Sequence, residues 1–310
     1  MINDLISKFK NFHNSSSYTR VSAEHSIELY YGKDELFRYS LLLISNTKPN
    51  VLDSTKIINV DIRKRDDNKW ILKFSLNDER FLDVFCCFCS DIIESTTYIK
   101  DLVFGTSFIC ERYLKWQNLL KKQSLDILSI AEIKGLIGEL YFLSEILAKK
   151  VGYEKAINAW TGPFMTIQDF YIDNIWYEVK ATTTGSENVK ISSIEQLDCE
   201  NLGNLVVINL NKTSSEDSNR INLNNIVNKI RNELDNYYLE LKFTSILLEK
   251  RYVYIDKYDE INFRFDGITY FLINNEFPCI RRNAVPKSIT NASYSISLAE
   301  IKNYEVENIL

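Results

Sequence analysis

The stretch that decides the fold is Gln168-Asp-Phe-Tyr-Ile-Asp-Asn-Ile-Trp-Tyr-Glu-Val-Lys-Ala181, in which two apolar and aromatic runs flank an Asp-Asn pair. Asp173 and Asn174 belong to the residue types that tolerate left-handed backbone angles, so they predict a two-residue turn between antiparallel strands. Such a turn pairs Ile172 with Ile175 and fixes the register of every later pair. The sequence therefore predicts a β-hairpin over these residues.

The predicted register gathers three charged side chains on one face of the hairpin. It places Asp169 opposite Glu178, where directly opposed Cβ atoms are about 4.5–5.5 Å apart. Lys180 follows Glu178 by two residues and shares its face, because side chains alternate along a strand. Two bare carboxylates about 5 Å apart repel each other by roughly 3 kcal/mol at an effective dielectric constant of about 20. A bound divalent cation would turn this repulsion into a binding site.

A hard cation such as Mg²⁺ suits this group of oxygen atoms. Proteins bind Mg²⁺ through one or two carboxylates together with carbonyl, water and phosphate oxygens, so the carbonyl of Val179 is a reasonable third ligand beside Asp169 and Glu178. The cation would acidify water and neutralise charge on a phosphodiester, while Lys180 would orient the attacking water and stabilise charge on the phosphate. An E-x-K triplet is common in proteins, so these residues, taken alone, favour the solvent-facing side of an ordinary hairpin over a functional site.

Upstream of the hairpin, residues 131–148 carry apolar side chains at the helical period. At about 100° per residue, Glu132 and Glu139 fall on one flank of the apolar face; a solvated position is the default for Glu132. Gly135 and Gly138 each cost about 1 kcal/mol in a helix interior, which suggests that another segment approaches closely there. We therefore expect an amphipathic helix with a tight contact at its glycines.

The N-terminal part of the chain predicts a β-rich region with connecting helices. Residues 36–82 read as the strands of a small antiparallel sheet, with a turn at 66–68. Residues 83–125 have a helical apolar pattern. A chain of 310 residues favours two domains, and we place the first at 1–128.

The C-terminal part, which we place at 129–310, predicts an α/β domain. Strands are expected at 205–210 and 268–273, and an amphipathic helix over 221–238. Strands that alternate with helices in this way indicate an α/β layer.

Five sequence blocks carry a resemblance to a known superfamily. They are Gly135-Leu-Ile-Gly-Glu-Leu140, Trp160-Thr-Gly-Pro163, Asp169-Phe170, Glu178-Val-Lys-Ala181 and Val189-Lys-Ile-Ser-Ser-Ile-Glu-Gln-Leu197. In order and spacing they resemble the PD-(D/E)XK nucleases, and more specifically a bacterial family of PD-(D/E)XK motif proteins found among restriction-modification and phage-defence genes. The close match spans about 131–197, and weaker similarity extends over most of the chain. Gln168 stands where the motif has its proline, a residue often lost in the superfamily.

The resemblance implies a restriction-endonuclease-like core, with a mixed central sheet flanked by helices, preceded by the smaller β-rich domain that would serve recognition or assembly. It implies that Asp169 and Glu178 are metal ligands and that Lys180 is the catalytic lysine. Glu139 stands where the superfamily has a helix glutamate, as a ligand or a nearby base.

The resemblance also places Ser192 and Gln196 beside the site, where they could touch phosphate or hold the lysine. Ser193 and Gln196 have, in addition, the spacing of a capping box at a helix start, and a helix start would favour a phosphate. The two interpretations are compatible.

The activity implied is that of a Mg²⁺-dependent DNA endonuclease, with Mn²⁺ as a substitute, in a restriction or anti-phage defence system. The net charge of −5 excludes a uniformly basic nucleic-acid coat; it favours a nuclease that works with other defence proteins, or one whose cleft alone is basic. A single site cuts one strand, so double-strand cleavage would need a homodimer or two visits. A non-catalytic DNA-binding or scaffolding subunit is an open alternative, as is a hydrolase of RNA or nucleotides.

Composition excludes several other classes of protein. The six cysteines include a single C-x-x-C pair, Cys86 and Cys89, with a third cysteine between them in an apolar stretch, so we expect reduced, mostly buried thiols rather than a zinc site. The two histidines, His13 and His25, lie in no recognisable site. No apolar run reaches the length of about 18 residues that a membrane span needs, and the N-terminus lacks the pattern of an export signal. We expect a cytoplasmic protein without a membrane partner.

Overall fold

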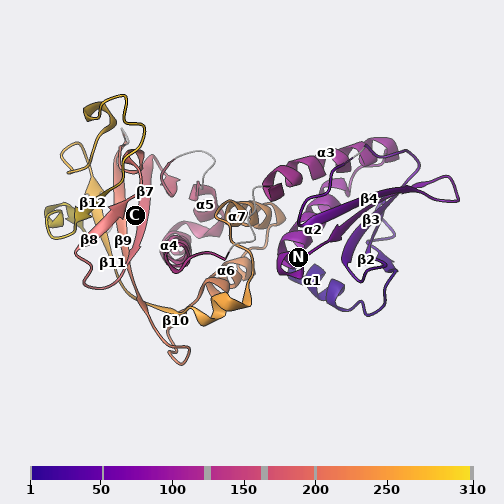
Figure 1. Cartoon of the computed structure of the whole chain (residues 1–310), viewed down its shortest axis with the longest axis horizontal. Helices are drawn as coiled ribbons and strands as arrows, with labels where there is room; N and C mark the ends of the chain where they lie inside the picture. Colours follow the sequence, from indigo (N-terminus) through magenta and orange to yellow (C-terminus); the bar gives the residue numbers. More distant parts are fainter. Residues whose placement is uncertain (1, 51, 122–126, 162–166, 199–200, 308–310) are drawn as a thin grey trace. The chain divides into compact units, whose positions relative to one another are not determined.

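The computed structural model describes residues 2–50, 52–121, 127–161, 167–198 and 201–307 (Figure 1). The chain forms two compact units, the first made of residues 1–125 and 243–254 and the second of residues 126–242 and 255–310. Both contain helices and strands, so the protein is a mixed α/β protein. Among the described residues, no helix is both long and apolar enough to cross a membrane.

The first unit contains a five-stranded antiparallel sheet of order β1-β2-β3-β5-β4. Its strands are β1 (Ser17–Arg20), β2 (Glu28–Lys33), β3 (Tyr39–Ser45), β4 (Ile58–Lys64) and β5 (Trp70–Leu76), and its helices are α1 (Ile2–Lys10), α2 (Leu82–Thr96) and α3 (Leu102–Lys121). The predicted turn at 66–68 joins β4 to β5, with Asn68 at a left-handed φ of 65°. The predictions of a small antiparallel sheet and of helices after it are confirmed.

Aromatic and cysteine side chains fill the core of the first unit. The ring of Phe74 on β5 packs against Phe88 of α2 and Tyr113 of α3, with centroids 5.1 and 5.0 Å away. The free thiols of the described cysteines are buried except that of Cys279, which is partly exposed; the buried ones are Cys86, Cys87, Cys89 and Cys110. Cys199 lies outside the described residues. The prediction of mostly buried thiols is confirmed for the cysteines described, and their reduced state stays a prediction.

The second unit contains a six-stranded mixed sheet of order β10-β11-β9-β7-β6, in which β13 also pairs with β11. Its strands are β6 (Phe170–Ile172), β7 (Ile175–Thr182), β9 (Gly203–Lys212), β10 (Arg220–Ile221), β11 (Phe263–Ile273) and β13 (Glu305–Val306), while β8 (Asn188–Ile191) and β12 (Tyr294–Ser297) form a separate pair. Strand β7 pairs parallel with β9, and the other pairs are antiparallel. The strands predicted at 205–210 and 268–273 lie within β9 and β11.

A long helical segment precedes the hairpin. It comprises α4 (Ile130–Tyr141), a π-helical turn (Phe142–Leu147) and α5 (Ala148–Ala159). Further helices are α6 (Leu223–Asn232) and α7 (Tyr237–Glu249), and short 3₁₀ turns lie at Glu79–Phe81, Ile194–Gln196, Asp256–Glu260, Arg282–Ala284 and Lys302–Tyr304. The single helix predicted over 221–238 is therefore wrong. Helix α6 ends at Asn232. Asn236 then caps the start of α7, because its Oδ1 accepts a hydrogen bond from the backbone N–H of Tyr238 at 2.8 Å.

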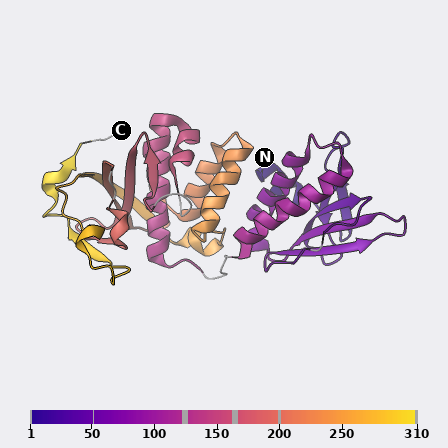
Figure 2. The same cartoon turned by 90° about the horizontal axis from the view of Figure 1, so that it is seen from above.

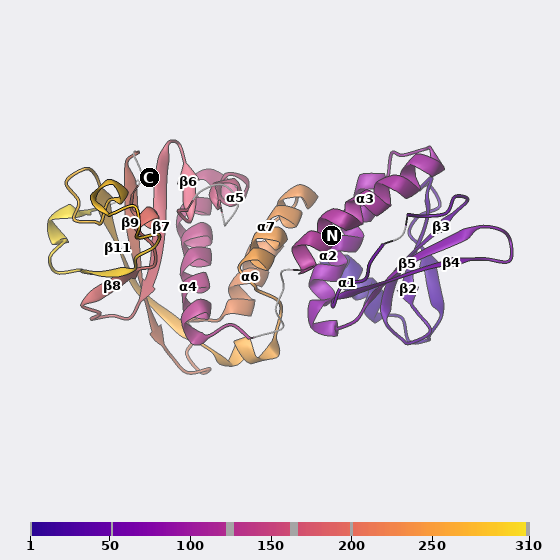
Figure 3. The same cartoon turned by 45° about the horizontal axis from the view of Figure 1, so that its top comes forward.

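The sheet of the second unit is covered on both faces (Figures 2 and 3). Helix α4 packs on one face, where a Cβ added at Gly138 would lie 3.0 Å from the Cβ of Ala181 on β7. The close approach predicted for Gly138 is confirmed, whereas Gly135 faces open space. On the other face, Trp176, Leu205 and Val207 pack in a cluster with residues of β8 and the C-terminal segment. The hairpin thus lies between two packed layers.

Candidate active site

The hairpin at 170–182 has the predicted register. Phe170 pairs with Tyr177 and Ile172 with Ile175. Asp173 and Asn174 adopt left-handed φ angles of 50° and 65°, as a two-residue turn of this type requires.

Asp169 comes just before the first residue of β6, and its carboxylate lies at the edge of β7. Its Oδ2 accepts a hydrogen bond from the backbone N–H of Val179 at 2.9 Å, and its own carbonyl accepts one from the N–H of Thr161 at 3.2 Å. The N–H and C=O of a strand residue point toward the same neighbouring strand. The carbonyl of Val179 therefore points to the edge on which the Asp169 carboxylate lies.

The carboxylate of Glu178 is almost fully buried, with 1% of the residue exposed. One oxygen, Oε1, accepts a hydrogen bond from Nζ of Lys180 at 2.6 Å, while Oε2 is buried and has no hydrogen-bond partner among the described residues. A buried carboxylate oxygen without a partner is costly, because its lost hydration is not replaced. The alternative of a solvent-facing hairpin surface is therefore wrong for Glu178.

The surroundings of Glu178 favour its protonated form in the absence of a cation. Burial raises the pKa of Glu178 well above its ordinary value of 4.5, and the negative charges of Asp169 and Glu139 raise it further. The attraction and hydrogen bond of Lys180 lower it but do not outweigh burial. An additional positive charge would favour the ionised carboxylate.

Lys180 is positioned by two acceptors. Besides Glu178, its Nζ approaches Oε1 of Gln196 at 3.3 Å. The same oxygen accepts hydrogen bonds from the backbone N–H groups of Ser192 at 2.7 Å and Ser193 at 3.4 Å, in a capping box at a 3₁₀ turn. Gln196 therefore both caps the turn and contacts the lysine, while its contact with phosphate stays a prediction. Ser192 contributes its backbone to this arrangement.

The two glutamates of α4 lie in different surroundings. Glu132 forms a capping box with Ser129 at the helix start, which accounts for it structurally. Glu139 is partly buried, and its Oε2 accepts a hydrogen bond from Nε1 of Trp160 at 2.9 Å. This contact joins two of the quoted blocks and was not expected from the sequence. Gly162 and Pro163 of the second block lie outside the described residues.

The oxygen atoms gathered at the hairpin fit the coordination of a divalent cation only in part. Within the described ranges, no three Asp, Glu, His or Cys side chains gather in an arrangement that could hold a metal ion, so Glu139 does not complete a three-carboxylate site. Asp169, Glu178 and the Val179 carbonyl offer two carboxylates and one carbonyl, a set typical of Mg²⁺ sites that also use water and phosphate oxygens. The unpartnered Oε2 of Glu178 is the oxygen such a cation would satisfy.

The family assignment comes from a comparison with family models. The model described as "Putative PD-(D/E)XK family member, (DUF4420)" matches residues 5–299. The chain belongs to this PD-(D/E)XK family. Searches of curated proteins and of solved structures gave no significant match. In this PD-(D/E)XK protein, the motif's proline is replaced by a buried Gln168, whose Nε2 donates a hydrogen bond to the carbonyl of Glu195 at 3.0 Å.

Proposed function

We propose that this protein is a metal-dependent DNA endonuclease with a restriction-endonuclease-like core, acting in a bacterial restriction or anti-phage defence system. Membership of the PD-(D/E)XK family supports a nuclease-like fold. The single observation that carries the proposal is the buried Glu178, near the Asp169 carboxylate: one of its oxygens accepts a hydrogen bond from Lys180, and the other has no partner in the part of the chain that the structure describes. Such an arrangement disfavours stability and suits charge-dependent chemistry.

Asp169, Glu178 and the carbonyl of Val179 would hold the cation, Mg²⁺ with Mn²⁺ as a substitute. When bound, it would supply an acidified water and positive charge on the scissile phosphate. The hydrogen bond from the N–H of Val179 fixes the Asp169 carboxylate. That contact holds this ligand in place before substrate arrives, which limits the reorganisation required during the reaction.

Lys180 would orient the attacking water and donate a hydrogen bond to a phosphate oxygen as negative charge develops there. Its ammonium is held by Glu178 and Gln196 at the face of the hairpin. Because Gln196 is itself fixed by two backbone N–H groups, the lysine has few alternative positions. Ordered charge of this kind stabilises a transition state more than mobile charge does.

A cleavage assay tests the proposal. Plasmid and phage DNA would be incubated with the full chain and Mg²⁺ or Mn²⁺, alone and together with proteins encoded beside it. Asp169→Ala and Lys180→Ala should each lower the cleavage rate by about 100-fold or more, whereas Lys190→Ala, at an exposed position of β8, should cleave like the parent. Equal cleavage by the parent and both site variants would show that the assignment is wrong.

A non-catalytic DNA-binding or scaffolding subunit is the second candidate, and the net charge of −5 favours it, because an acidic chain alone binds DNA weakly. It predicts no cation binding at the hairpin. Calorimetric titration with Mn²⁺ separates the two, since the nuclease proposal predicts binding that Glu178→Ala removes. RNA and nucleotide substrates in the cleavage panel test the remaining alternative.

A further inference from the structure

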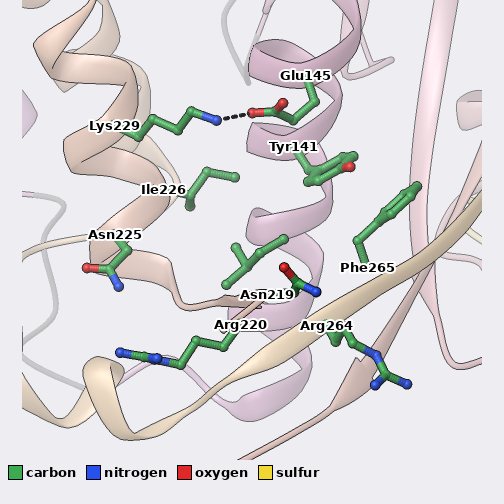
Figure 4. Close-up of a pocket in the computed structure, with 10 residues that line it drawn as sticks. Tyr141, Glu145, Asn219, Arg220, Asn225, Ile226, Lys229, Arg264 and Phe265 are labelled. Carbon is green, nitrogen blue, oxygen red and sulfur yellow. Dashed lines mark hydrogen bonds and ion pairs between the residues drawn. The ribbon is translucent and has the colours of Figure 1, made fainter. Parts of the chain in front are cut away.

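A cavity lies in the same unit as the hairpin, apart from the residues of the candidate active site. It has a volume of about 550 Å³, within the range of small-molecule sites. Its walls come from the end of α4 and the following π-helical turn, from α6, and from the β10 and β11 region (Figure 4). None of Asp169, Glu178 or Lys180 lines it.

One wall of this cavity is aromatic and apolar. Tyr141 and Phe265 are stacked, with ring centroids 4.4 Å apart and planes 12° from parallel. Figure 4 shows Ile226 facing Tyr141 from α6, with Phe265 on the far side of the Tyr141 ring. A planar ring that enters between Ile226 and Tyr141 would extend this stack. Base-on-aromatic stacking contributes about 1–3 kcal/mol per base.

The rim of the cavity carries an excess of positive charge. Its charged residues are Arg220, Arg264, Lys229 and Glu145. Glu145 is neutralised by Lys229, with 2.5 Å between Nζ and Oε1, and also by Lys149. Although burial raises the pKa of Glu145, its hydrogen bonds to these lysines hold that pKa below the ordinary value.

The two arginines lie at the other end of the cavity from this ion pair (Figure 4). Arg264 forms a 4.0 Å ion pair with Asp217, and Arg220 donates a hydrogen bond to the backbone carbonyl of Asp217 at 3.3 Å. Both side chains are exposed, so their guanidinium groups keep donors for another acceptor. Arginine forks match the geometry of phosphate oxygens.

We infer that this cavity binds a nucleotide, with the base against Tyr141 and Ile226 and the phosphate at the arginine-bearing end, where the guanidinium groups of Arg220 and Arg264 point to different sides (Figure 4). A flat ring with an attached anion matches both the apolar wall and the cationic rim. The amides of Asn219 and Asn225, which also line the cavity, offer hydrogen-bond donors and acceptors to a base edge. The ligand is a free nucleotide or an unstacked nucleotide of a nucleic acid, and this inference does not depend on the hydrolytic activity.

Titration calorimetry in EDTA tests the inference without catalysis. The probes are AMP, adenosine and a six-nucleotide single-stranded DNA, each added to the full chain. AMP or the oligonucleotide should bind, and adenosine should bind at least tenfold more weakly than AMP if the free nucleotide is the ligand. Binding of the oligonucleotide without AMP would assign the cavity to a nucleotide of the nucleic acid.

Variants locate the binding. Arg220→Glu and Arg264→Glu should each weaken it at least tenfold, and Tyr141→Leu should weaken it at least fivefold. Lys287→Glu and Lys302→Glu change the charge equally at exposed positions of the same unit and should weaken it less than twofold. Failure of AMP and of the oligonucleotide to bind would overturn the inference. So would equal losses in the cavity variants and the controls.

Discussion

Two nearly fully buried charges, one in each unit, differ in how they are satisfied. Lys73 on β5 has a side chain 1% exposed, yet its Nζ donates to both oxygens of Glu35 at 2.8 and 3.0 Å and lies 3.6 Å from Asp61. Glu178 on β7 is equally buried, but within the described ranges one of its oxygens has Lys180 as a partner and the other has none. A buried charged group whose opposite charges are all in place fits a structural role, whereas a buried group that lacks a partner indicates a binding or catalytic site.

The pKa values of the two glutamates, Glu35 beside Lys73 and Glu178 itself, shift in opposite directions. The hydrogen bond from Lys73 holds the pKa of Glu35 below its ordinary value. Burial raises the pKa of Glu178 well above it. Stability from Glu35 is therefore present above its unfolded pKa and is lost as pH falls through its folded pKa. Glu178 has the opposite effect. Because the folded state holds its proton more tightly, the stability of the protein falls as pH rises from the unfolded pKa of Glu178 through its folded pKa.

The largest expected effect is on the DNA cleavage rate, which should depend on Glu178 but not on Lys73. Glu178→Gln keeps the shape of the side chain but removes an anionic cation ligand, so the cleavage rate with Mg²⁺ should fall by about 100-fold or more. Lys73→Met should leave the rate per folded molecule unchanged. Both rates come from plasmid cleavage corrected for the folded fraction. If Lys73→Met lowered the cleavage rate as much as Glu178→Gln, the assignment of a structural role to Lys73 and a catalytic role to Glu178 would be wrong.

The next effect concerns stability in the first unit. Lys73→Met leaves Glu35 and Asp61 without their shared cation, and we expect a loss of about 1–3 kcal/mol in the free energy of unfolding. The loss stays below that of a fully buried pair because both carboxylates are partly exposed and regain water. Urea denaturation followed by circular dichroism measures it. Lys64→Met, at an exposed position of β4, is the control and should change stability little.

A smaller effect of opposite sign is expected at Glu178. Because its carboxylate is buried and incompletely paired, Glu178→Gln should stabilise the metal-free protein at pH 8 by about 1 kcal/mol, within the range seen when buried charges are replaced. The gain should shrink as pH falls toward 4.5, because the raised pKa lets the folded parent take up the proton before the unfolded chain does. Thermal melts from pH 4.5 to 8 measure the trend. A variant that melts below the parent at pH 8 would contradict the unfavourable burial of this charge.

The smallest effect belongs to Gln196, which acts through Lys180. Gln196→Ala removes one of the two acceptors of the lysine ammonium, so kcat should fall by about three- to tenfold with KM unchanged. Gln196→Glu, which keeps an acceptor oxygen, should restore much of the loss. Steady-state kinetics with a short duplex measure both constants. A rise in KM at constant kcat would instead assign Gln196 to substrate binding.

The sequence predicted the hairpin well because its information is local. Asp173 and Asn174 fix a two-residue turn, and the turn fixes the register that brings Asp169 near Glu178. The contact between Gln196 and Lys180 was partly predicted, because the family order of blocks places one beside the other.

The burial of Glu178 could not be predicted in the same way. Its face of the sheet is covered by a cluster that includes Ile296 and Ile301, more than one hundred residues further along the chain. Lys73 is a similar case. Alternation along β5 places it on the face opposite the apolar side chains, where a lysine would be expected in solvent, yet the structure buries it and pairs it with Glu35. The Trp160 contact with Glu139 also depends on packing between distant segments.

The most direct test of the central claim is a crystal structure of the protein soaked with Mn²⁺, with anomalous scattering recorded at the manganese edge. The account predicts one peak within coordination distance of the carboxylates of Asp169 and Glu178, and its loss in Glu178→Ala crystals soaked in the same way. Crystals without manganese at this position, at concentrations that support DNA cleavage, would contradict the account.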